Sequence, residues 1–251
     1  MKLTLLGTGS FITDLNHFGP GYLLEIDDKK ILIDAGQGTV IHLLQLGIKV
    51  QDLDYIFITH FHADHTADIA SILLNYYITC RNHNFSKKIK ILGPVGTKDF
   101  LTALVLLTKH KGVANLEDFE VEDILGEKSF ENFQVEAFKV EHLDLDARAF
   151  KFTANGKSIV LSGDVRICEG IKEAAKEVDL FVVDSSMPKG QGNEYHLATD
   201  QIADICRENG VKKVILSHVT QSSEGHDSVA EVREGFDGEV ILGEDLKSFE
   251  V

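Results

Sequence analysis

The sequence predicts an α/β protein in which two sheets pack together and helices cover their outer faces. Short apolar runs of the strand type recur along the 251 residues, and helical patterns fall between many of them. The dipeptides Asp27-Asp28 and Asn155-Gly156 each divide a pair of such runs, which indicates an antiparallel hairpin in each half of the chain. Hairpins and helix-separated strands in both halves favour two packed sheets over one.

Runs that are short, apolar and bounded by turn residues are predicted to be strands. In chain order these are Lys2–Leu6, Gly21–Ile26, Lys30–Asp34, Tyr55–Ile58, Ile89–Leu92, Phe133–Val140, Ala147–Phe152, Ser158–Leu161, Leu180–Val183, Lys213–Ser217 and Val240–Leu242. Helices are predicted where the pattern is helical, at Thr39–Leu46, Ala67–Thr79, Thr97–Lys109, Gly170–Lys176, Thr199–Asn209 and Ser228–Glu234. The sequence contains no repeat, low-complexity tract or proline-rich linker, so we expect one domain over residues 1–251.

The composition is that of an ordinary soluble globular protein, with 43% apolar and 26% charged residues. The sequence has no run of about eighteen apolar residues, so no membrane association is expected. The N-terminal run reads as a first strand and not as a signal peptide. Three widely separated cysteines, Cys80, Cys168 and Cys206, predict neither a disulfide framework nor a thiolate zinc site. A reducing, cytoplasmic location is therefore expected.

The formal net charge of −15 lowers the expectation of a large nucleic-acid partner. Nucleic acids and anionic lipids need lysine and arginine to displace their counterions, and an acidic surface opposes that. The charge by itself does not exclude such a partner, since the sequence leaves a local basic patch open. A homodimer is left open by the sequence.

A dense group of metal-binding side chains follows the predicted strand Tyr55–Ile58. Residues 60–65 read His60-Phe61-His62-Ala63-Asp64-His65, which places three imidazoles and a carboxylate within six residues. Imidazole and carboxylate suit zinc, iron and manganese. A polar loop that happens to be rich in histidine is the alternative.

Three further candidate ligands each follow a predicted strand. His142 comes after Phe133–Val140, Asp164 follows Ser158–Leu161 and a short turn, and His218 comes directly after Lys213–Ser217. Taken alone, His142 and His218 would be ordinary histidines and Asp164 a turn or helix cap. Beside the 60–65 motif they complete a donor set for two metal ions.

The spacing predicts how these ligands are divided. His60 and His62 point to the same side of an extended segment, so they are predicted to share one metal with His142. Asp64 and His65 are predicted to share the second metal with His218. Asp164 is the natural bridge, because a carboxylate can give one oxygen to each ion.

These motifs resemble those of a known family. Asp34 in Ile33-Asp34-Ala35-Gly36, the 60–65 motif, His142, Ser162-Gly163-Asp164 and Ser217-His218 are similar to the five ordered motifs of the metallo-β-lactamase superfamily. The resemblance implies a four-layer αβ/βα sandwich with a dinuclear site at one edge of its two sheets. It also implies that Asp34 orients a ligand. The expected cofactors are two divalent metal ions, with Zn²⁺ as the expected ion and Mn²⁺ or iron as the alternatives.

A narrower resemblance is to the ribonuclease Z-like phosphodiesterases. Tyr195-His196-Leu197-Ala198-Thr199 is similar to their additional histidine motif, although His196 could also be a helix-start histidine without a chemical role. Gly7-Thr8-Gly9 and residues 36–39 look like that group as well. Members that process tRNA carry a long substrate-binding arm in the interval from His142 to Asp164, where this chain has only 21 residues. The arm is therefore absent.

The resulting prediction is a dinuclear metal-dependent hydrolase that uses a metal-bridging hydroxide on small phosphodiesters such as cyclic nucleotides. Asp64 is predicted to accept the proton of the attacking water, and His196 to stabilise charge or protonate the leaving group. The alternatives are a thioester, ester or lactone hydrolase, a tRNA 3′-end endonuclease, a diiron redox centre and a non-catalytic metal-binding module.

Two segments near these motifs carry weaker signals. The loop of residues 10–19 is predicted to be a solvated connection, with a border of the substrate pocket as the alternative. Residues 185–190, which precede His196, are an open candidate for phosphate contacts.

Overall fold

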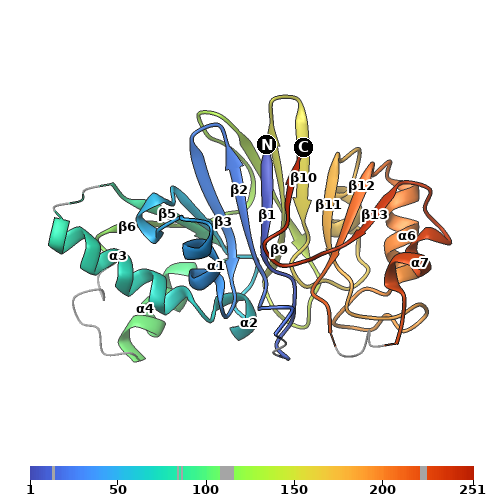
Figure 1. Cartoon of the computed structure of the whole chain (residues 1–251), viewed down its shortest axis with the longest axis horizontal. Coiled ribbons are helices and arrows are strands. Elements are labelled where there is room, and N and C mark those ends of the chain that lie inside the picture. Colours follow the sequence, from blue (N-terminus) through green and yellow to red (C-terminus); the bar gives the residue numbers. More distant parts are fainter. Residues whose placement is uncertain (13–14, 84, 86, 108–115, 221–224) are drawn as a thin grey trace.

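Two seven-stranded sheets face each other in the computed structural model, with helices on both outer faces (Figure 1). The structure describes residues 1–12, 15–83, 85, 87–107, 116–220 and 225–251. The strand order is β14-β1-β2-β3-β4-β5-β6 in the first sheet and β13-β12-β11-β10-β9-β8-β7 in the second. This arrangement confirms the predicted α/β sandwich.

The first sheet combines an antiparallel and a parallel half. Strands β14 to β3 pair antiparallel, and β3 to β6 pair parallel. Its strands are β1 (Lys2–Gly7), β2 (Gly21–Ile26), β3 (Lys29–Ala35), β4 (Tyr55–Phe57), β5 (Ile89–Gly93), β6 (Phe119–Asp123) and β14 (Ser248–Glu250). The N- and C-terminal strands are neighbours, because Lys2 pairs with Glu250 (Figure 1).

The second sheet has the same mixed design. Strands β7 to β10 pair antiparallel, and β10 to β13 pair parallel. Its strands are β7 (Gly126–Ser129), β8 (Gln134–Val140), β9 (Ala147–Ala154), β10 (Lys157–Leu161), β11 (Leu180–Asp184), β12 (Lys213–Ser217) and β13 (Glu239–Leu242). Both predicted hairpins, β2–β3 and β9–β10, are confirmed.

The helices connect the parallel strands. They are α1 (Thr39–Gln45), the 3₁₀ helix η1 (Val50–Asp52), α2 (Ala63–Thr66), α3 (Ile69–His83), α4 (Thr97–Leu107), α5 (Glu169–Ala174), α6 (Thr199–Glu208) and α7 (Ser228–Arg233). Helix α3 buries one stripe, at Ile69, Ile72, Leu73, Tyr76 and Cys80, in the spacing of an amphipathic helix. No helix in the described ranges is long and apolar enough to cross a membrane.

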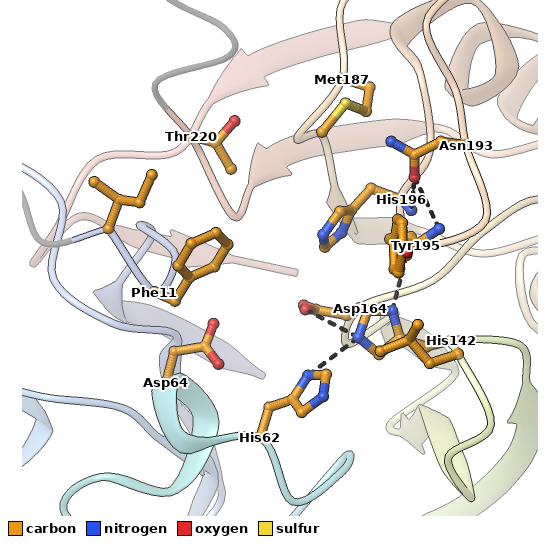
Figure 2. Close-up of a pocket in the computed structure, with 12 residues that line it drawn as sticks. Phe11, His62, Asp64, His142, Asp164, Met187, Asn193, Tyr195, His196 and Thr220 are labelled. Atoms are coloured by element: carbon orange, nitrogen blue, oxygen red, sulfur yellow. Dashed lines mark hydrogen bonds and ion pairs between the residues drawn. The ribbon is translucent and has the colours of Figure 1, made fainter.

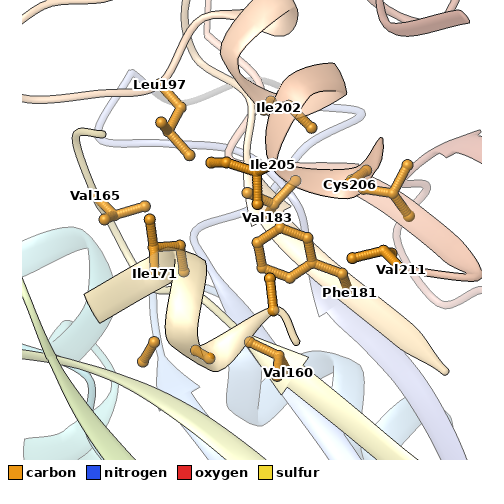
Figure 3. Close-up of a cluster of buried hydrophobic side chains, with 14 of the residues drawn as sticks. Val160, Val165, Ile171, Phe181, Val183, Leu197, Ile202, Ile205, Cys206 and Val211 are labelled. Carbon is orange, nitrogen blue, oxygen red and sulfur yellow. The ribbon is translucent and has the colours of Figure 1, made fainter. Parts of the chain in front are cut away.

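Three apolar layers hold the sandwich together. One lies between the two sheets and includes Phe57, Phe150 and Phe152. A second packs α3 and α4 onto the first sheet, and a third packs α5 and α6 onto the second sheet around Phe181 (Figure 3). Each sheet is therefore buried on both faces over its parallel half, as expected for strands joined by helices.

Strands β6, β7 and β14 are not predicted from the sequence. Each is the last strand at a sheet edge, and their sequences FEVED, GEKS and SFE contain charged or polar residues. Edge strands face water on one side, so they lack the continuous apolar run of a central strand. The predicted helix Ala67–Thr79 corresponds to α3, which ends later at His83 and is preceded by the separate short helix α2. The predicted end of α4, at residues 108–109, lies outside the described residues.

Candidate metal centre

The 60–65 motif occupies the connection between β4 and α2. Strand β4 ends at Phe57, and α2 begins at Ala63. His60 is fully buried in the connection, and His62 is half-buried directly before the helix. Asp64 and His65 lie in the first turn of α2 and are buried. An extended segment followed by a helical turn therefore presents all four side chains within one short stretch.

A first group of side chains gathers around His142, which lies beyond the end of β8. The possible ligand atoms of His60, His62, His142 and Asp164 all lie within 4.8 Å of one another. His142 Nε2 is 3.2 Å from His62 Nδ1 and 3.7 Å from Asp164 Oδ2. Three ring nitrogens and one carboxylate oxygen thus surround a common point.

A second group gathers around His218, which follows β12. Asp64, His65, Asp164 and His218 also place their possible ligand atoms within 4.8 Å. His65 Nε2 and His218 Nε2 lie 2.9 and 3.2 Å from Asp164 Oδ1. His218 Nε2 is 3.3 Å from Asp64 Oδ2. Asp164 therefore directs Oδ1 to this group and Oδ2 to the first.

The structure brings together the seven side chains that the sequence predicts to be ligands, in the two predicted groups. They come from four separate connections, after β4, β8, β10 and β12. His218 has a φ of 57° and Asp34, at the end of β3, a φ of 55°. Both residue types tolerate this left-handed backbone better than most. Their role as ligands stays a prediction.

The donor atoms fit bound divalent metals. Among the described residues, four buried side-chain nitrogen or oxygen atoms make no hydrogen bond of normal geometry, and three are at this site. They are His60 Nε2, and His65 Nε2 and Asp164 Oδ1, which face each other over 2.9 Å. An unsatisfied buried polar atom costs about 1–3 kcal/mol. A metal ion satisfies such atoms, and imidazole with carboxylate is a donor set suited to zinc, manganese and iron.

Hydrogen bonds from outside the cluster fix the ring orientations. His65 Nδ1 donates to Asp34 Oδ2 over 2.7 Å, and His142 Nδ1 donates to the Tyr195 carbonyl over 2.8 Å. The backbone amide and the hydroxyl of Thr59 also donate to Asp34, each over 2.8 Å. With Nδ1 engaged, Nε2 of each ring faces the cluster. These hydrogen bonds agree with the orienting role that the resemblance implies for Asp34.

Asp184, at the end of β11, links the cluster to His196. Its Oδ2 accepts from His196 Nδ1 over 2.7 Å. Its Oδ1 accepts from the Ser186 hydroxyl, whose oxygen lies 2.8 Å from His218 Nδ1. Asp184 is not predicted from the sequence, although it directly follows the predicted strand Leu180–Val183, just as the other candidates follow strands. Asp184 is thus linked to His196 directly and to His218 through Ser186. Together with Asp164, the residues Asp184, His196 and His218 form a third group whose possible ligand atoms lie within 4.8 Å of one another.

Burial and neighbouring charges set the protonation of these groups. Burial, together with the nearby His65, holds the pKa of His60 well below its usual value, which favours the neutral imidazole that a metal needs. Burial disfavours charge on Asp164, but His218 and His65 outweigh it and hold the pKa of Asp164 well below its usual value. Burial also opposes charge on His196, yet the Asp184 carboxylate raises the pKa of His196 to about 9.

A pocket of about 350 Å³ opens onto this centre (Figure 2). The pocket is lined by His62, Asp64, His142, Asp164 and His196. The two predicted catalytic residues and the predicted bridging carboxylate therefore line the same pocket. His196 therefore lies beside the metal-binding groups and has a hydrogen-bonded carboxylate partner. Its catalytic role stays a prediction.

The two weaker sequence signals also border this pocket. Phe11 and Ile12 line it, so the prediction that the loop of residues 10–19 is only a solvated connection is wrong for its first part. Asp14 of that loop lies outside the described residues. In residues 185–190, Met187 lines the pocket and Ser186 supports His218. Phosphate contacts by this segment stay a prediction.

The fold and the paired histidine–aspartate groups define a protein with the metallo-β-lactamase fold. A solved structure with that fold, YhfI from Bacillus subtilis, superposes with a TM-score of 0.84 at 18% identity, covering 100% of this chain and 99% of that one. A diphosphatase structure from the PhnP family gives a TM-score of 0.78 at 17% identity, with 100% and 97% coverage. Ribonuclease Z of Mycolicibacterium gilvum is 24% identical over 279 residues, covering 100% of this chain and 96% of the relative. The chain belongs to the family described as Anti-Pycsar protein Apyc1, whose model matches residues 1–237.

Proposed function

We propose that this protein is a dinuclear metal-dependent phosphodiesterase that acts on small substrates. The observation that carries the proposal is the position of Asp164. One of its oxygens faces His65 and His218, and the other faces His60 and His142. A carboxylate shared between two ligand groups suits two ions held close together, the arrangement used for in-line displacement at phosphorus.

The bound ions and Asp64 are proposed to generate the nucleophile. Two bound divalent ions supply a nucleophile at neutral pH by lowering the pKa of water, and they neutralise charge on phosphate oxygens. Asp64 is both a member of the second group and a pocket-lining residue, so its carboxylate can take the proton of the attacking water.

His196 is placed to act on the leaving group. Its Nδ1 donates to Asp184, which holds the ring in one orientation and favours its protonated form. Its side chain lines the pocket, so Nε2 is the nitrogen available to substrate. A protonated imidazole in that place can stabilise charge on the phosphoryl group or give a proton to the leaving alkoxide.

Three observations support a small substrate. The interval from His142 to Asp164 contains the β9–β10 hairpin, whose two strands belong to the second sheet, and not a long substrate-binding arm. The chain has a net charge of −15, which opposes broad contact with a polyanion. The pocket volume of about 350 Å³ lies at the low end of the range for small-molecule sites. Cyclic nucleotides are substrates of this size and charge.

A second candidate function is RNA processing, because relatives along the whole chain are named Ribonuclease Z. The acidic charge and the hairpin in place of an arm count against it. Hydrolysis of thioesters, esters or lactones uses the same nucleophile at a carbonyl carbon. Zn²⁺ as the metal, a homodimer and a cytoplasmic location stay predictions.

A substrate panel on metal-loaded protein tests the proposal. Bis-p-nitrophenyl phosphate, cyclic nucleotides, a precursor tRNA, thioesters and lactones are assayed beside elemental analysis of the bound metal. We expect turnover of the phosphodiesters and two metal equivalents per chain. Thioester or lactone turnover without phosphodiester turnover contradicts the proposal, and cleavage confined to the precursor tRNA selects the second candidate.

The variant His196→Ala tests the assigned proton donor. Loss of a general acid costs about 10²–10⁴-fold in rate, while the metal content should remain that of the wild type. His226→Ala is the matched control, because His226 is exposed and contacts Glu231 on α7. Unchanged turnover in His196→Ala removes the role, and loss of metal reassigns the residue to the metal centre.

A further inference from the structure

Apolar side chains gather at the mouth of the pocket although they are open to solvent. The exposed fractions are 67% for Phe11, 37% for Ile12, 47% for Leu143 and 39% for Tyr195, and all four line the pocket. Leu143 and Tyr195 each stand next to a histidine of the site in the sequence. We call these four residues the apolar rim. Single exposed apolar residues are common, but several around one pocket indicate a binding function.

The backbone of Leu143 points to the same conclusion. Its φ is 52°, a left-handed conformation that is uncommon for a bulky residue. Such backbone is retained where the surrounding structure or the function requires it. Here it accompanies a leucine that is half exposed and faces the pocket. A turn closed by a hydrogen bond from the Leu145 amide to the His142 carbonyl over 3.2 Å sets this backbone, and it presents the leucine to the pocket instead of burying it.

The loop that carries Phe11 is anchored at its base. Asp245 accepts hydrogen bonds from the Thr8 amide over 2.9 Å and from the Phe18 amide over 2.8 Å. The Gly9 amide donates to the Phe18 carbonyl over 2.8 Å. The two ends of the loop are thus tied together by a residue near the C-terminus. Phe11 projects from a fixed base toward the pocket.

The chemistry of the pocket is divided between its floor and its mouth. The floor holds Asp64, Asp164 and the histidines, where an anionic group would meet the bound metals. None of the described lining residues is a lysine or an arginine, so the described mouth offers no partner for a second negative charge. Phe11 lies across the pocket from Tyr195 and His142 (Figure 2). A flat uncharged group can lie between these two sides.

We infer that the apolar rim is a subsite for an uncharged aromatic group carried by the substrate, with Phe11 and Leu143 as its specificity-determining residues. The inference rests on the proposed function, which places the phosphodiester at the metal-binding groups. The inference adds that the apolar rim of the protein recognises the substituent of the substrate that does not react. Aromatic contacts of this kind add affinity through buried apolar area and ring stacking.

Two substrates with the same leaving group isolate this subsite. Bis-p-nitrophenyl phosphate retains an aromatic ring after p-nitrophenolate leaves, whereas methyl p-nitrophenyl phosphate retains only a methyl group. We expect the wild type to favour the aryl substrate in kcat/KM by about tenfold after correction for the rates in buffer, mainly through KM.

Variants of the rim should remove that preference. Phe11→Ala is expected to bring the ratio of the two kcat/KM values to within about twofold of unity. Leu143→Gly should lower the ratio several-fold, and glycine suits its left-handed backbone, so folding is not at risk. Leu15→Ala is the matched control: Leu15 belongs to the same loop, is 91% exposed and does not line the pocket. Its ratio should equal that of the wild type.

A binding measurement separates the subsite from the reaction. Calorimetric titration of metal-loaded wild type with phenylphosphonate and methylphosphonate should show about tenfold tighter binding of the phenyl compound, and Phe11→Ala should abolish the difference. Ring preference in binding without any phosphodiester turnover would leave the subsite standing and reject the proposed function. Turnover with no ring preference in either assay would reject the subsite and leave the proposed function standing.

The oligomeric state is measured on the same samples by sedimentation. If Phe11→Ala dissociates a wild-type dimer and leaves the ring preference intact, the apolar rim is a contact between copies, and the inference is overturned. An unchanged oligomeric state together with a lost ring preference supports it.

Discussion

Hydrogen bonds to Nδ1 set the orientation of three histidine rings at this centre. His65, His142 and His218 each engage Nδ1 with an acceptor outside the cluster, respectively Asp34, a backbone carbonyl and a serine hydroxyl. Each ring is therefore held with Nε2 inward before any metal binds. The ligand side chains lose their conformational entropy during folding and not when the metal binds, which favours metal affinity.

Asp34→Asn tests this orientation at a single residue. Asparagine tolerates the left-handed backbone of this position, but it cannot stabilise the His65 ring and Thr59 in the same way. Metal affinity should fall about 10–100-fold, measured by competition with a chelator of known affinity. Asp68→Asn is the control, because Asp68 accepts from the Val40 amide and contacts no ligand that the structure describes. Equal affinities in the two variants would contradict the role of Asp34.

At the scale of elements, the ends of the parallel strands carry the chemistry. Strands β3, β4, β10, β11 and β12 are each followed by, or end in, a residue of the centre. Parallel strands point their carboxyl ends to one edge, so the polar residues that follow them meet there. The opposite ends of these strands have structural interactions of their own. Asp179, directly before β11, accepts hydrogen bonds from the Ser158 amide over 2.9 Å and from the ammonium group of Lys212 over 2.8 Å.

Asp179→Asn is expected to make stability less dependent on acid pH. Partial burial opposes charge on Asp179, but its bonds to Lys212 and Ser158 prevail and lower the pKa in the folded state. A lowered folded pKa contributes stability that is present above the unfolded pKa of about 3.9 and is lost as the pH falls through the folded pKa. The variant should lose about 1 kcal/mol at pH 7 in urea unfolding, and its difference from the wild type should shrink as the pH falls below about 3.9.

The control for this measurement is Asp204→Asn, since Asp204 and its partner Arg207 are both exposed. Exposed pairs contribute little, so its unfolding free energy should stay within about 0.5 kcal/mol of the wild type at both pH values. A difference between Asp179→Asn and the wild type that persists unchanged at pH 3 would show that the charge of Asp179 is not its source.

For the whole molecule, the centre joins the two halves of the sandwich. Asp64 and His218 are 154 residues apart in the chain and belong to connections of different sheets, yet their side chains meet. Bound metals would add bonds between the sheets at the edge where the buried polar atoms make no hydrogen bond of normal geometry. Metal content should therefore govern the stability of the entire fold.

Removal of metal by a chelator is expected to lower the melting temperature. A ligand present at 100 times its Kd stabilises the folded state by about 2.7 kcal/mol, and each kcal/mol shifts the melting temperature of a protein of this size by about 2–4 °C. Each site should therefore contribute a shift of about 5–10 °C, measured by scanning calorimetry and reversed on adding metal back. The same melting temperature with and without metal would contradict metal binding between the sheets.

The sequence by itself determined the central strands, the α/β class and the seven candidate ligands, because apolar periodicity and ligand chemistry are local properties of the chain. It did not determine the edge strands β6, β7 and β14, whose pairing depends on neighbours distant in sequence. It also gave no role to Asp184 or Phe11. Asp184 has a role in the centre only because β11 lies beside β12. That pairing brings Asp184 to His196 and to the contact between Ser186 and His218. Phe11 acquires one only because Asp245, more than two hundred residues later, fixes its loop at the pocket. Tertiary structure decided these features because each depends on which side chains meet in space.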